Sequence, residues 1–459
     1  MRVLYATAEL HPVVTVGGLA AAAAGLTAEL RRQGVEVEVA LPYYGGIALD
    51  GEASVELEVP AWAAPAHARV GSHPAAGPLM LVSVPGITRP DPYVDEHGEG
   101  WPDNDRRFFA FAAAVAALAR LRGPDVLHVN DWHAATALAA FESPPSSVLS
   151  IHNLAYQGQA ARRWVKRLGP RGRAYRRSKT CNPLAGAIVL ADATVVVSPT
   201  YREEVLQPEG GCGLDDLLRS RGQALVGIRN GIDTTLWDPA ADPHLPLRFD
   251  ATDLTGKDVC RAAALAHVGL PDGDGPLAVV VSRLTEQKGI DLLLPLVPEL
   301  HALGLRLAVL GAGQAALTEE LRAAAERHPL QLAFVEGYHE ALAHLLIAGA
   351  DLLLMPSRSE PCGLTQMQAM RYGTLPVVTD VGGLHDTVSD LDEAPARGTG
   401  WRSAAATSDA VADAVQRAVT GWRNADVRRA AQQRGMRADW SWREPASRHV
   451  ALYRAVAAR

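Results

Sequence analysis

The chain has 459 residues, of which 48% are hydrophobic and 21% are charged, and its formal net charge is −7. This length is typical of two or three domains, each able to bury its own core. The negative charge gives no electrostatic basis for binding nucleic acid, and no apolar stretch approaches the roughly 20 residues that span a bilayer. The four cysteines are scattered without CxxC spacing, which indicates neither a disulfide framework nor a zinc site. We therefore expect a cytoplasmic globular protein with no nucleic-acid or membrane partner.

The first half of the chain alternates predicted strands with helices. Strands are predicted over residues 3–7 and 35–41, and between them lie Gly17-Gly18 and an Ala-rich helix over 19–32. This pattern is a βαβ unit with a glycine-rich first loop. Three more strands are predicted over residues 125–129, 147–151 and 193–197.

Polar residues stand where these predicted strands end. Asn130-Asp131 follows one strand, His152 follows the next, and Ser198-Pro199 follows the third. Open α/β sheets bind ligands at the carboxyl ends of their strands, so these positions are candidates for a site.

The same alternation restarts near residue 276. A strand over 277–281 ends in Ser282-Arg283, and Lys288-Gly289 is expected to open the next helix. Strands over 305–310 and 332–335 follow. The stretch before the restart, residues 230–246, is rich in Pro and Asp, which is typical of a hinge. We predict domains over residues 1–233 and 234–440, with a terminal helix within 441–459 that packs back on the first domain.

The segment over residues 357–388, with the strand that precedes it, is the most informative. A buried strand, 351–355, is followed by the carboxylate of Glu360 and by the loop Cys362 to Thr365. A second strand, 375–378, leads into Gly382-Gly383. Two glycine-bearing loops at the ends of neighbouring strands, with one carboxylate between them, suit a diphosphate and the hydroxyl groups of a sugar.

The motifs of this chain resemble those of the bacterial glycogen and plant starch synthases. The matching motifs keep the same order over nearly the whole chain: Glu9, Gly17 to Leu19, Pro102 to Phe108, Asn130 to His133, Ile151 to Gly158, Ser198 to Tyr201, Cys212 to Asp215, Asn230 to Asp233, Ser282 to Gly289 and Ser357 to Val388. The resemblance implies an α/β, GT-B fold: two doubly wound Rossmann-like domains with an interdomain cleft. It also implies a retaining, metal-independent glycosyltransferase that uses a nucleotide diphosphate-activated donor.

The resemblance further implies the residues of the site. Five positions match catalytic residues of the family: Asp131, His152, Arg283, Lys288 and Glu360. Six match residues that bind the nucleotide part of the donor: Gly18, Tyr338, Cys362, Gly363, Leu364 and Thr365. No metal and no cofactor are implied, because the donor is a substrate and protein cations carry the developing phosphate charge.

Each of these side chains has an expected role. Arg283 and Lys288 match the phosphate-binding pair of the family, and Glu360 matches the carboxylate that holds hydroxyl groups of the donor sugar. His152 corresponds to the histidine near the anomeric carbon. Asp131 lies in the loop on the acceptor side, and Tyr338 matches the residue that stacks on the nucleobase.

Two other patterns carry less weight. Asp390-Leu391-Asp392 has the DxD spacing of metal-dependent transferases, but it lies in an acidic loop away from any predicted strand end. Gly311-Ala312-Gly313 resembles part of a dinucleotide fingerprint and lacks its third glycine.

The chain departs from the family in its first loop. The family pattern is Lys-x-Gly-Gly-Leu-x-Asp, and this chain has Thr15 and Ala21 where the family has the lysine and the aspartate. One lost charge-assisted contact costs roughly 1.5–3 kcal/mol. Gln368 also replaces the second glutamate of the wider E-x7-E pattern, although glucan synthases commonly lack that acid too.

Three functions remain open at this point. The first is a glucan synthase that tolerates the altered loop. The second is a relative with another donor–acceptor pair, for example a pseudo-glycosyltransferase that joins a nucleotide-activated cyclitol to an amino sugar in acarviosyl-type secondary metabolism. The third is a non-catalytic glucan-binding protein, which the retained charged residues disfavour. The partners are thus a nucleotide-sugar or nucleotide-cyclitol donor and a carbohydrate or amino-sugar acceptor.

Overall fold

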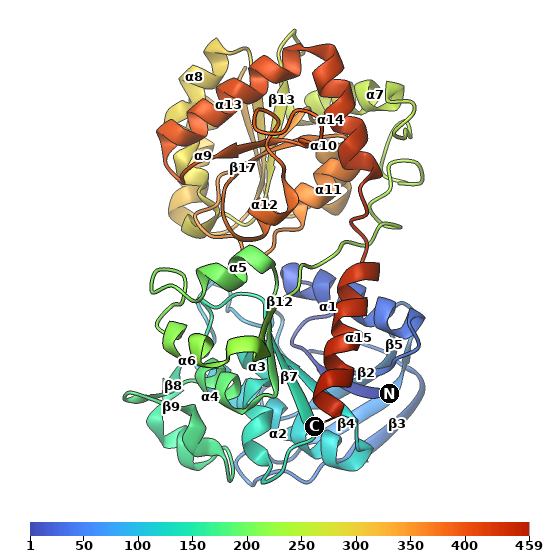
Figure 1. Cartoon of the computed structure of the whole chain (residues 1–459), viewed down its shortest axis with the longest axis vertical. Helices are drawn as coiled ribbons and strands as arrows, with labels where there is room; N and C mark the ends of the chain where they lie inside the picture. The colour runs from blue at the N-terminus through green and yellow to red at the C-terminus, as the bar shows by residue number, and fades with distance from the viewer. Residues whose placement is uncertain (459) are drawn as a thin grey trace. The chain divides into compact units, whose positions relative to one another are not determined.

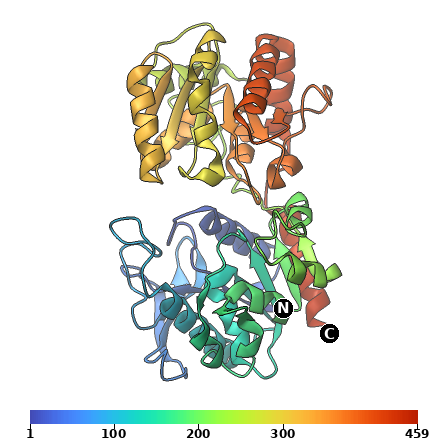
Figure 2. The same cartoon turned by 90° about the vertical axis from the view of Figure 1, so that its left-hand side faces the viewer.

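The computed structural model describes residues 1–458, which fall into two compact units (Figures 1 and 2). Unit 1 comprises residues 1–231 together with the C-terminal segment that starts at Trp442. Unit 2 comprises residues 232–441. Each unit is built on its own mainly parallel sheet and has its own hydrophobic core. None of the helices within residues 1–458 is long and apolar enough to cross a bilayer.

The sheet of unit 1 has nine strands in the order β12-β11-β7-β6-β1-β2-β5-β4-β3. The strands from β12 to β5 run parallel to one another, and β4 and β3 are antiparallel. The strands are β1 (Arg2–Ala6), β2 (Glu36–Pro42), β3 (Asp50–Glu56), β4 (His67–His73), β5 (Gly77–Ser83), β6 (Val126–Asn130), β7 (Ser146–Ile151), β11 (Ala193–Val196) and β12 (Leu225–Gly227). The α-helices are α1 (Gly18–Arg32), α2 (Asn104–Arg122), α3 (Asp131–Ala135), α4 (Pro183–Leu190), α5 (Pro199–Glu204), α6 (Asp215–Ser220) and α15 (Arg443–Ala457).

The sequence patterns did not reveal two parts of unit 1. One is the β5-β4-β3 extension of the sheet, whose outer strand β3 is almost entirely exposed and shows no apolar alternation. The other is a small antiparallel sheet in the order β8-β10-β9, formed by Ala160–Ala161, Thr180–Cys181 and Arg176–Arg177. Its strands have two residues each, too few to produce a recognisable period.

The C-terminal helix α15 packs in the core of unit 1. Val450, Tyr453 and Val456 lie in the same buried cluster as residues of β1 and α1. Trp442 packs so closely on Gly25 that a Cβ there would lie 2.0 Å from the indole nitrogen. Tyr453 also makes a 2.6 Å hydrogen bond with the ring of His128 in β6. The last helix therefore folds with the N-terminal residues of the chain.

The sheet of unit 2 has six parallel strands in the order β15-β14-β13-β16-β17-β18. Helices lie on both sides of this sheet (Figure 2). The strands are β13 (Leu277–Val281), β14 (Arg306–Gly311), β15 (Leu332–Glu336), β16 (Leu352–Met355), β17 (Leu375–Thr379) and β18 (Trp401–Ser403). The α-helices are α7 (Thr255–Val268), α8 (Val297–Ala302), α9 (Ala315–Arg327), α10 (Glu340–Gly349), α11 (Thr365–Arg371), α12 (Gly382–Thr387), α13 (Ser408–Arg423) and α14 (Ala425–Arg437).

One local prediction in unit 2 is wrong. Lys288-Gly289 does not open a helix, because Lys288 ends the short 3₁₀ turn η5 (Glu286–Lys288) and Gly289 has a left-handed φ of 67°. Two further 3₁₀ turns follow before α8 begins at Val297. Pro295 and Pro298 lack the N–H groups that a continuous helix needs, which explains why these turns stay separate.

Candidate functional site

The centre of the candidate site in unit 2 is the point where the strand order reverses. The chain runs from β13 outward to β14 and β15 and then returns to β16 on the other side of β13. The loops that follow β13 and β16 therefore lie side by side at the carboxyl edge of the sheet, where open α/β sheets bind ligands. Lys288 comes from the first loop and Glu360 from the second. Lys288 Nζ lies 2.6 Å from Glu360 Oε2.

Glu360 is held on several sides. Only 7% of its side chain is exposed, and Ser357 Oγ donates a 3.0 Å hydrogen bond to the same carboxylate oxygen that pairs with Lys288. The Gly383 N–H donates to the Glu360 carbonyl oxygen at 3.0 Å. Within residues 1–458, the second carboxylate oxygen, Oε1, accepts no hydrogen bond from the protein. One oxygen thus fixes the group, and the other can accept from a ligand hydroxyl.

The two loops are joined by direct contacts. A Cβ at Gly289 would lie 2.0 Å from the carbonyl oxygen of Pro356, so only glycine permits this approach. The Arg358 N–H donates to the Gln287 carbonyl oxygen at 2.8 Å. The Arg358 guanidinium makes two hydrogen bonds of 2.8 and 2.6 Å to the carboxylate of Asp291. The relative position of Lys288 and Glu360 is therefore set by backbone packing as well as by their own ion pair.

Arg283 differs from Lys288 in its surroundings. It follows β13 directly, its side chain is exposed, and within residues 1–458 its guanidinium has no hydrogen-bond or ion-pair partner. Five N–H groups are therefore available to an anion from solvent. Unit 2 accordingly places one paired and one unpaired cation in the loop that follows its central strand.

The loop from Cys362 to Thr365 packs against the start of α12. A Cβ at Gly383 would lie 2.1 Å from the Cys362 carbonyl oxygen, and Gly363 has a left-handed φ of 70°. The Gln366 side-chain amide donates to the carbonyl oxygens of Cys362 and Gly363 at 3.0 and 3.2 Å. Cys362 is buried, so this loop offers a ligand its backbone and not the thiol.

Tyr338 stands apart from these residues. It follows β15, the edge strand of the sheet, two strands away from β13, and it is 68% exposed. The structure therefore does not bring it into contact with Lys288 or Glu360. Its ring is open to solvent and free to stack on a flat ligand.

In unit 1, the strand order reverses between β1 and β6. Asp131 follows β6 with a left-handed φ of 50°, and its Oδ1 accepts a 2.8 Å hydrogen bond from the His152 N–H. The Asp131 carboxyl is buried, and burial raises its pKa to about 7, with the nearby charge of Glu9 acting in the same direction. A carboxyl of this kind can change its charge near neutral pH.

The tautomer of His152 follows from its neighbour Asn130. The Asn130 amide donates to the Ala6 carbonyl oxygen at 3.0 Å, so its own Oδ1 faces His152 Nε2, also at 3.0 Å. That oxygen can only accept, so Nε2 carries the proton and Nδ1 keeps a lone pair. Burial, with nearby His449, lowers the pKa of His152 to about 4. The ring is therefore neutral at pH 7.

Glu9 holds the glycine loop of unit 1 in place. The sequence analysis did not predict this role. The carboxylate of Glu9 accepts hydrogen bonds from the N–H groups of Val16 and Gly17 at 2.9 and 2.7 Å. The hydroxyl of Tyr93 donates to its other oxygen at 2.7 Å. Gly18, which starts α1, directly follows the residues that Glu9 holds.

Thr15 is the exposed residue at the position where the family lysine stands. Its hydroxyl makes a 3.1 Å hydrogen bond with Nδ1 of His11, and Ala21 on α1 is likewise exposed. Neither Tyr93 nor His11 was predicted. Tyr93 lies in a long irregular segment before α2, where no periodic signal exists, and His11 stands alone in the sequence.

The two weaker sequence patterns have structural explanations. Asp390 and Asp392 both pair with Arg417, at 3.3 and 2.7 Å. Across residues 1–458, no group of three or more His, Cys, Asp or Glu side chains is arranged to hold a metal ion. A Cβ at Gly311 or Gly313 would lie 2.0 or 2.1 Å from a carbonyl oxygen of the β13 loop, so both glycines serve packing.

The comparisons with known proteins agree with this architecture. Residues 2–220 match the family described as the starch synthase catalytic domain, and residues 265–435 match the glycosyl transferases group 1 family. The glycogen synthase of Halorhodospira halophila is 42% identical, over 100% of this chain and 99% of its own length. The chain belongs to the glycogen and starch synthase family. It is a glycosyltransferase of the glycogen synthase type.

Other relatives of this glycogen synthase-type enzyme support the same assignment. The glycogen synthase of Alkalilimnicola ehrlichii is 42% identical over 99% of this chain and 98% of its own. The catalytic domain of starch synthase IV from Arabidopsis thaliana, solved with ADP and acarbose bound, is 30% identical, with a TM-score of 0.89 over 100% of this chain and 99% of that chain. Sucrose-phosphate synthase from Thermosynechococcus elongatus, at 19% identity and a TM-score of 0.66 over 100% and 99%, shares the fold. The predicted GT-B fold is confirmed.

Proposed function

We propose that this glycogen synthase-type enzyme transfers a glucosyl unit from a nucleotide diphosphate sugar to a glucan. In this proposal the reaction retains the anomeric configuration and needs no metal. The observation that carries the proposal is the arrangement at the strand reversal of unit 2. There the partly buried Lys288 pairs with the buried Glu360 in the loops after β13 and β16. Arg283, which has no side-chain partner within residues 1–458, follows β13.

The donor is assigned to unit 2. Arg283 and Lys288 would bind the diphosphate, and these charge-assisted contacts would strengthen as charge develops on the leaving group. Glu360 Oε1 would accept from a hydroxyl of the donor sugar. The backbone groups of the loop from Cys362 to Thr365 would contact the same donor. Tyr338 would stack on the base, which suits its exposed ring.

The acceptor is assigned to unit 1, from which only the backbone of Gly18 would contact the diphosphate of the donor. Asp131 would orient the attacking hydroxyl, and the neutral ring of His152 would lie beside the anomeric carbon with Nδ1 able to accept. The domains proposed are residues 1–233 for the acceptor, residues 234–440 for the donor, and the terminal segment 441–459. None of the four cysteines forms a disulfide within residues 1–458, which fits the proposed cytoplasmic location.

The bond changes in this mechanism are few. The bond between the anomeric carbon and the diphosphate oxygen breaks, and its electron pair leaves with the nucleotide diphosphate. The acceptor hydroxyl oxygen attacks the same face of the sugar and forms the new glycosidic bond. The departing phosphate oxygen takes the hydroxyl proton, so no protein nucleophile is needed. Stabilisation of the leaving charge by two protein cations is the main contribution of the protein.

The relatives support this choice of substrates. Full-length relatives are named glycogen synthases, and the Arabidopsis starch synthase IV structure holds ADP and acarbose. The exposed Thr15 and Ala21 favour one alternative, a rerouted transferase that joins a nucleotide-activated cyclitol to an amino sugar. An amine acceptor needs less proton removal, so a lost charge in the acceptor loop would matter less.

A donor panel tests the proposed function. Purified protein is incubated with EDTA, glycogen and each of several nucleotide diphosphate sugars, and separately with a nucleotide-activated cyclitol and an amino sugar. Nucleotide release and glucan elongation are both measured. We expect a nucleotide diphosphate glucose to release one nucleotide for each glucosyl unit added to the glucan. NMR should show that the new linkage has the same anomeric configuration as the donor. Release only with a cyclitol donor and an amino-sugar acceptor would replace the proposal with the alternative. No transfer with any pair would reject both.

A further inference from the structure

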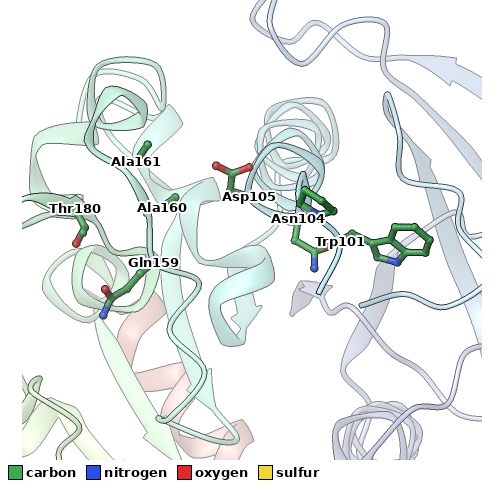
Figure 3. A pocket seen from close by; sticks show the side chains of 8 residues that line it. Trp101, Asn104, Asp105, Gln159, Ala160, Ala161 and Thr180 are labelled. Carbon is green, nitrogen blue, oxygen red and sulfur yellow. The ribbon is translucent and has the colours of Figure 1, made fainter. Parts of the chain in front are cut away.

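A buried polar network lies beside His152 in the core of unit 1. Its members are Tyr5 in β1, His128 and Asn130 in β6 and Ser150 in β7, and all four are buried. These strands are neighbours in the sheet. None of the residues that line the open pocket of unit 1 (Figure 3) belongs to the network, so the network is not a wall of that pocket. Polar groups that are buried in this way destabilise a fold unless they are hydrogen-bonded to one another.

The side-chain amide of Asn130 is fixed by three contacts. Its Oδ1 accepts a 3.0 Å hydrogen bond from the Tyr5 hydroxyl and faces His152 Nε2 at 3.0 Å, which uses both lone pairs. Its Nδ2 donates to the Ala6 carbonyl oxygen at 3.0 Å. Turning the amide over would place Oδ1 against the Ala6 carbonyl oxygen and leave the Tyr5 hydroxyl proton without an acceptor. The amide therefore has one orientation, in which it presents only an acceptor to His152.

Tyr5 is itself held in place. Its ring contacts the ring of His128 edge-on, with 4.6 Å between the ring centroids. His128 makes hydrogen bonds at both ring nitrogens, at 2.6 Å to the Tyr453 hydroxyl and at 2.7 Å to the Ser150 hydroxyl. Burial raises the pKa of Tyr5 far above the neutral range, so its hydroxyl stays protonated and remains a donor. The position of this hydroxyl is thus set by the C-terminal helix α15 as well as by β1.

Asn130 influences the charge of His152 as well as its tautomer. A carboxylate in place of the amide would favour the imidazolium form and raise the pKa of His152, whereas the uncharged amide does so much less. In the proposed mechanism, the departing diphosphate leaves positive charge on the anomeric carbon. A positive ring beside that carbon would raise the barrier by Coulomb repulsion. A neutral ring with a lone pair on Nδ1 avoids that repulsion.

We propose that Tyr5 is a positioning residue for the transfer reaction. By donating to Asn130 Oδ1, it holds the amide so that His152 keeps its proton on Nε2 and its lone pair on Nδ1. The proposal deepens the proposed function and rests on it for the place of His152 beside the anomeric carbon. Tyr5 and Asn130 do not touch the sugar, and they act on the reaction through the tautomer and charge of His152.

Three variants test the role of Tyr5. Tyr5→Phe removes only the hydroxyl. Tyr175→Phe is the matched control, because Tyr175 is equally buried in unit 1 and its hydroxyl donates at 2.7 Å to the backbone carbonyl oxygen of Ala135. Asn130→Asp keeps the shape of the side chain and places a carboxylate beside His152.

Two measurements are made on the same proteins. Long-range proton–nitrogen NMR spectra of the histidine rings report the tautomer and the pKa of His152 in the absence of any substrate, and the signals are assigned by their loss in His152→Gln. Steady-state kinetics with glycogen and the best donor of the panel give kcat and the KM for that donor. A loss of packing alone would change stability without moving the proton on the His152 ring.

We expect the wild-type His152 ring to carry its proton on Nε2. In Tyr5→Phe, about half or more of the molecules should carry it on Nδ1, and kcat should fall about twofold to tenfold, as expected for one lost hydrogen bond. The KM for the donor should stay within about twofold, because the ring acts on the transition state. Tyr175→Phe should keep the wild-type tautomer, and its kcat should stay within about twofold of wild type.

Asn130→Asp gives an independent result. Its His152 ring should titrate at a pH at least about one unit higher than in wild type, because the carboxylate stabilises the imidazolium. Its kcat should be about tenfold or more below wild type at low pH, and the deficit should shrink as pH rises above the new pKa. An unchanged titration of His152 in Asn130→Asp would reject the contact on which the proposal depends.

Further outcomes would overturn the role of Tyr5. In an active protein the proposal needs both changes in Tyr5→Phe, so a wild-type tautomer, or a kcat no lower than that of Tyr175→Phe, rejects it. A wild-type His152 ring with its proton on Nδ1 rejects it as well.

The NMR measurement separates this proposal from the proposed function, because it needs neither donor nor glucan. A protein that transfers no sugar with any pair, and in which Tyr5→Phe shifts the tautomer, keeps the control of His152 by Tyr5 and loses the proposed function. A protein that elongates glycogen, with the same tautomer and kcat in wild type and Tyr5→Phe, keeps the function and loses the positioning role.

Discussion

The strand reversals of the two units have the same topology and opposite electrostatics. In unit 2, the loops around β13 and β16 carry Lys288, Glu360 and the unpartnered Arg283. In unit 1, the loops around β1 and β6 carry two carboxyl groups, Glu9 and Asp131, and neither has a Lys or Arg partner within residues 1–458. One reversal thus presents a net positive charge to a ligand, and the other presents two carboxyl groups.

This difference shows how a carboxylate can be kept buried without a cation. The carboxylate of Glu9 is stabilised by hydrogen bonds from the N–H groups of Val16 and Gly17 and from the Tyr93 hydroxyl. Asp131 has only backbone donors, and burial raises its pKa more than those hydrogen bonds lower it. Unit 1 therefore keeps its loop folded without the lysine that the family has at position 15. The absence of that lysine therefore affects the binding of a ligand and not the folding of the loop.

The largest effect is expected from the two cations of unit 2. Lys288→Ala and Arg283→Ala should each lower kcat by about a hundredfold to a thousandfold, because each removes a donor to the developing phosphate charge. Their stabilities should differ. Lys288→Ala leaves Glu360 buried without its partner and should cost about 2 kcal/mol, whereas Arg283→Ala should change the free energy of unfolding by less than about 0.5 kcal/mol.

Steady-state kinetics and urea unfolding measure both quantities on the same proteins. Arg327→Ala is the control for Arg283→Ala. Arg327 is an exposed arginine in another part of unit 2, and it makes no ion pair within residues 1–458. Near-normal turnover in both site variants would contradict the phosphate role. Equal loss of stability in both would contradict the difference in their contacts.

The next largest effect concerns Asp131 and depends on pH. Its native pKa is about 7 and its ordinary value is 3.8, so between these values the native protein keeps a proton that the unfolded chain has lost. The stability that this group contributes is therefore present at low pH and is lost as pH rises through 7. Asp131→Asn removes that loss and should be more stable than wild type at pH 8 by up to about 4 kcal/mol.

The same variant tests catalysis. Asparagine tolerates the left-handed backbone of position 131 and can still accept from the His152 N–H. If the ionised carboxylate orients the acceptor, the kcat of the wild-type enzyme rises with pH to a plateau above pH 7. The kcat of Asp131→Asn should be about a hundredfold lower and should not rise with pH. Thermal unfolding at pH 5 and pH 8 and a pH–rate profile measure both effects. A variant with wild-type kcat and an unchanged profile would remove Asp131 from the site.

A smaller effect is expected from restoring the family residue in unit 1. Thr15→Lys should raise glucan transfer about tenfold, because it returns one charge-assisted contact to the glycine loop. Thr15→Met supplies a similar chain without the charge and should leave transfer unchanged. Initial rates of glycogen elongation give the comparison. No gain in Thr15→Lys would favour the rerouted donor–acceptor pair over a weakened glucan synthase.

The smallest effect is expected at Tyr338. Tyr338→Ala should raise the KM for the donor about threefold to tenfold with little change in kcat, because stacking on a base is made equally in the ground and transition states. Tyr338→Phe keeps the ring and should behave as wild type. A fall in kcat for Tyr338→Ala, with KM unchanged, would contradict a stacking role.

The sequence predicted the fold because its signals are local. Buried strands followed by polar residues recur in both halves, and Glu360 and Lys288 were found from the short motifs around them. Their pairing joins residues 72 positions apart, which no local pattern reveals. The contact between Tyr93 and Glu9 spans 84 positions, and Tyr93 lies in an irregular segment. The helix predicted to begin at Lys288 is replaced by short 3₁₀ turns, because Pro295 and Pro298 lack the N–H groups that a continuous helix needs.

The central claim is that the nucleotide diphosphate is bound by unit 2, whereas Asp131 of unit 1 serves the acceptor. Calorimetric titration of ADP into wild type, Lys288→Ala and Asp131→Asn tests it most directly. We expect the Kd of ADP to rise at least about tenfold in Lys288→Ala, which loses a charged contact, and to stay within about twofold of wild type in Asp131→Asn. Wild-type affinity in Lys288→Ala, or a comparable loss in Asp131→Asn, would contradict the account.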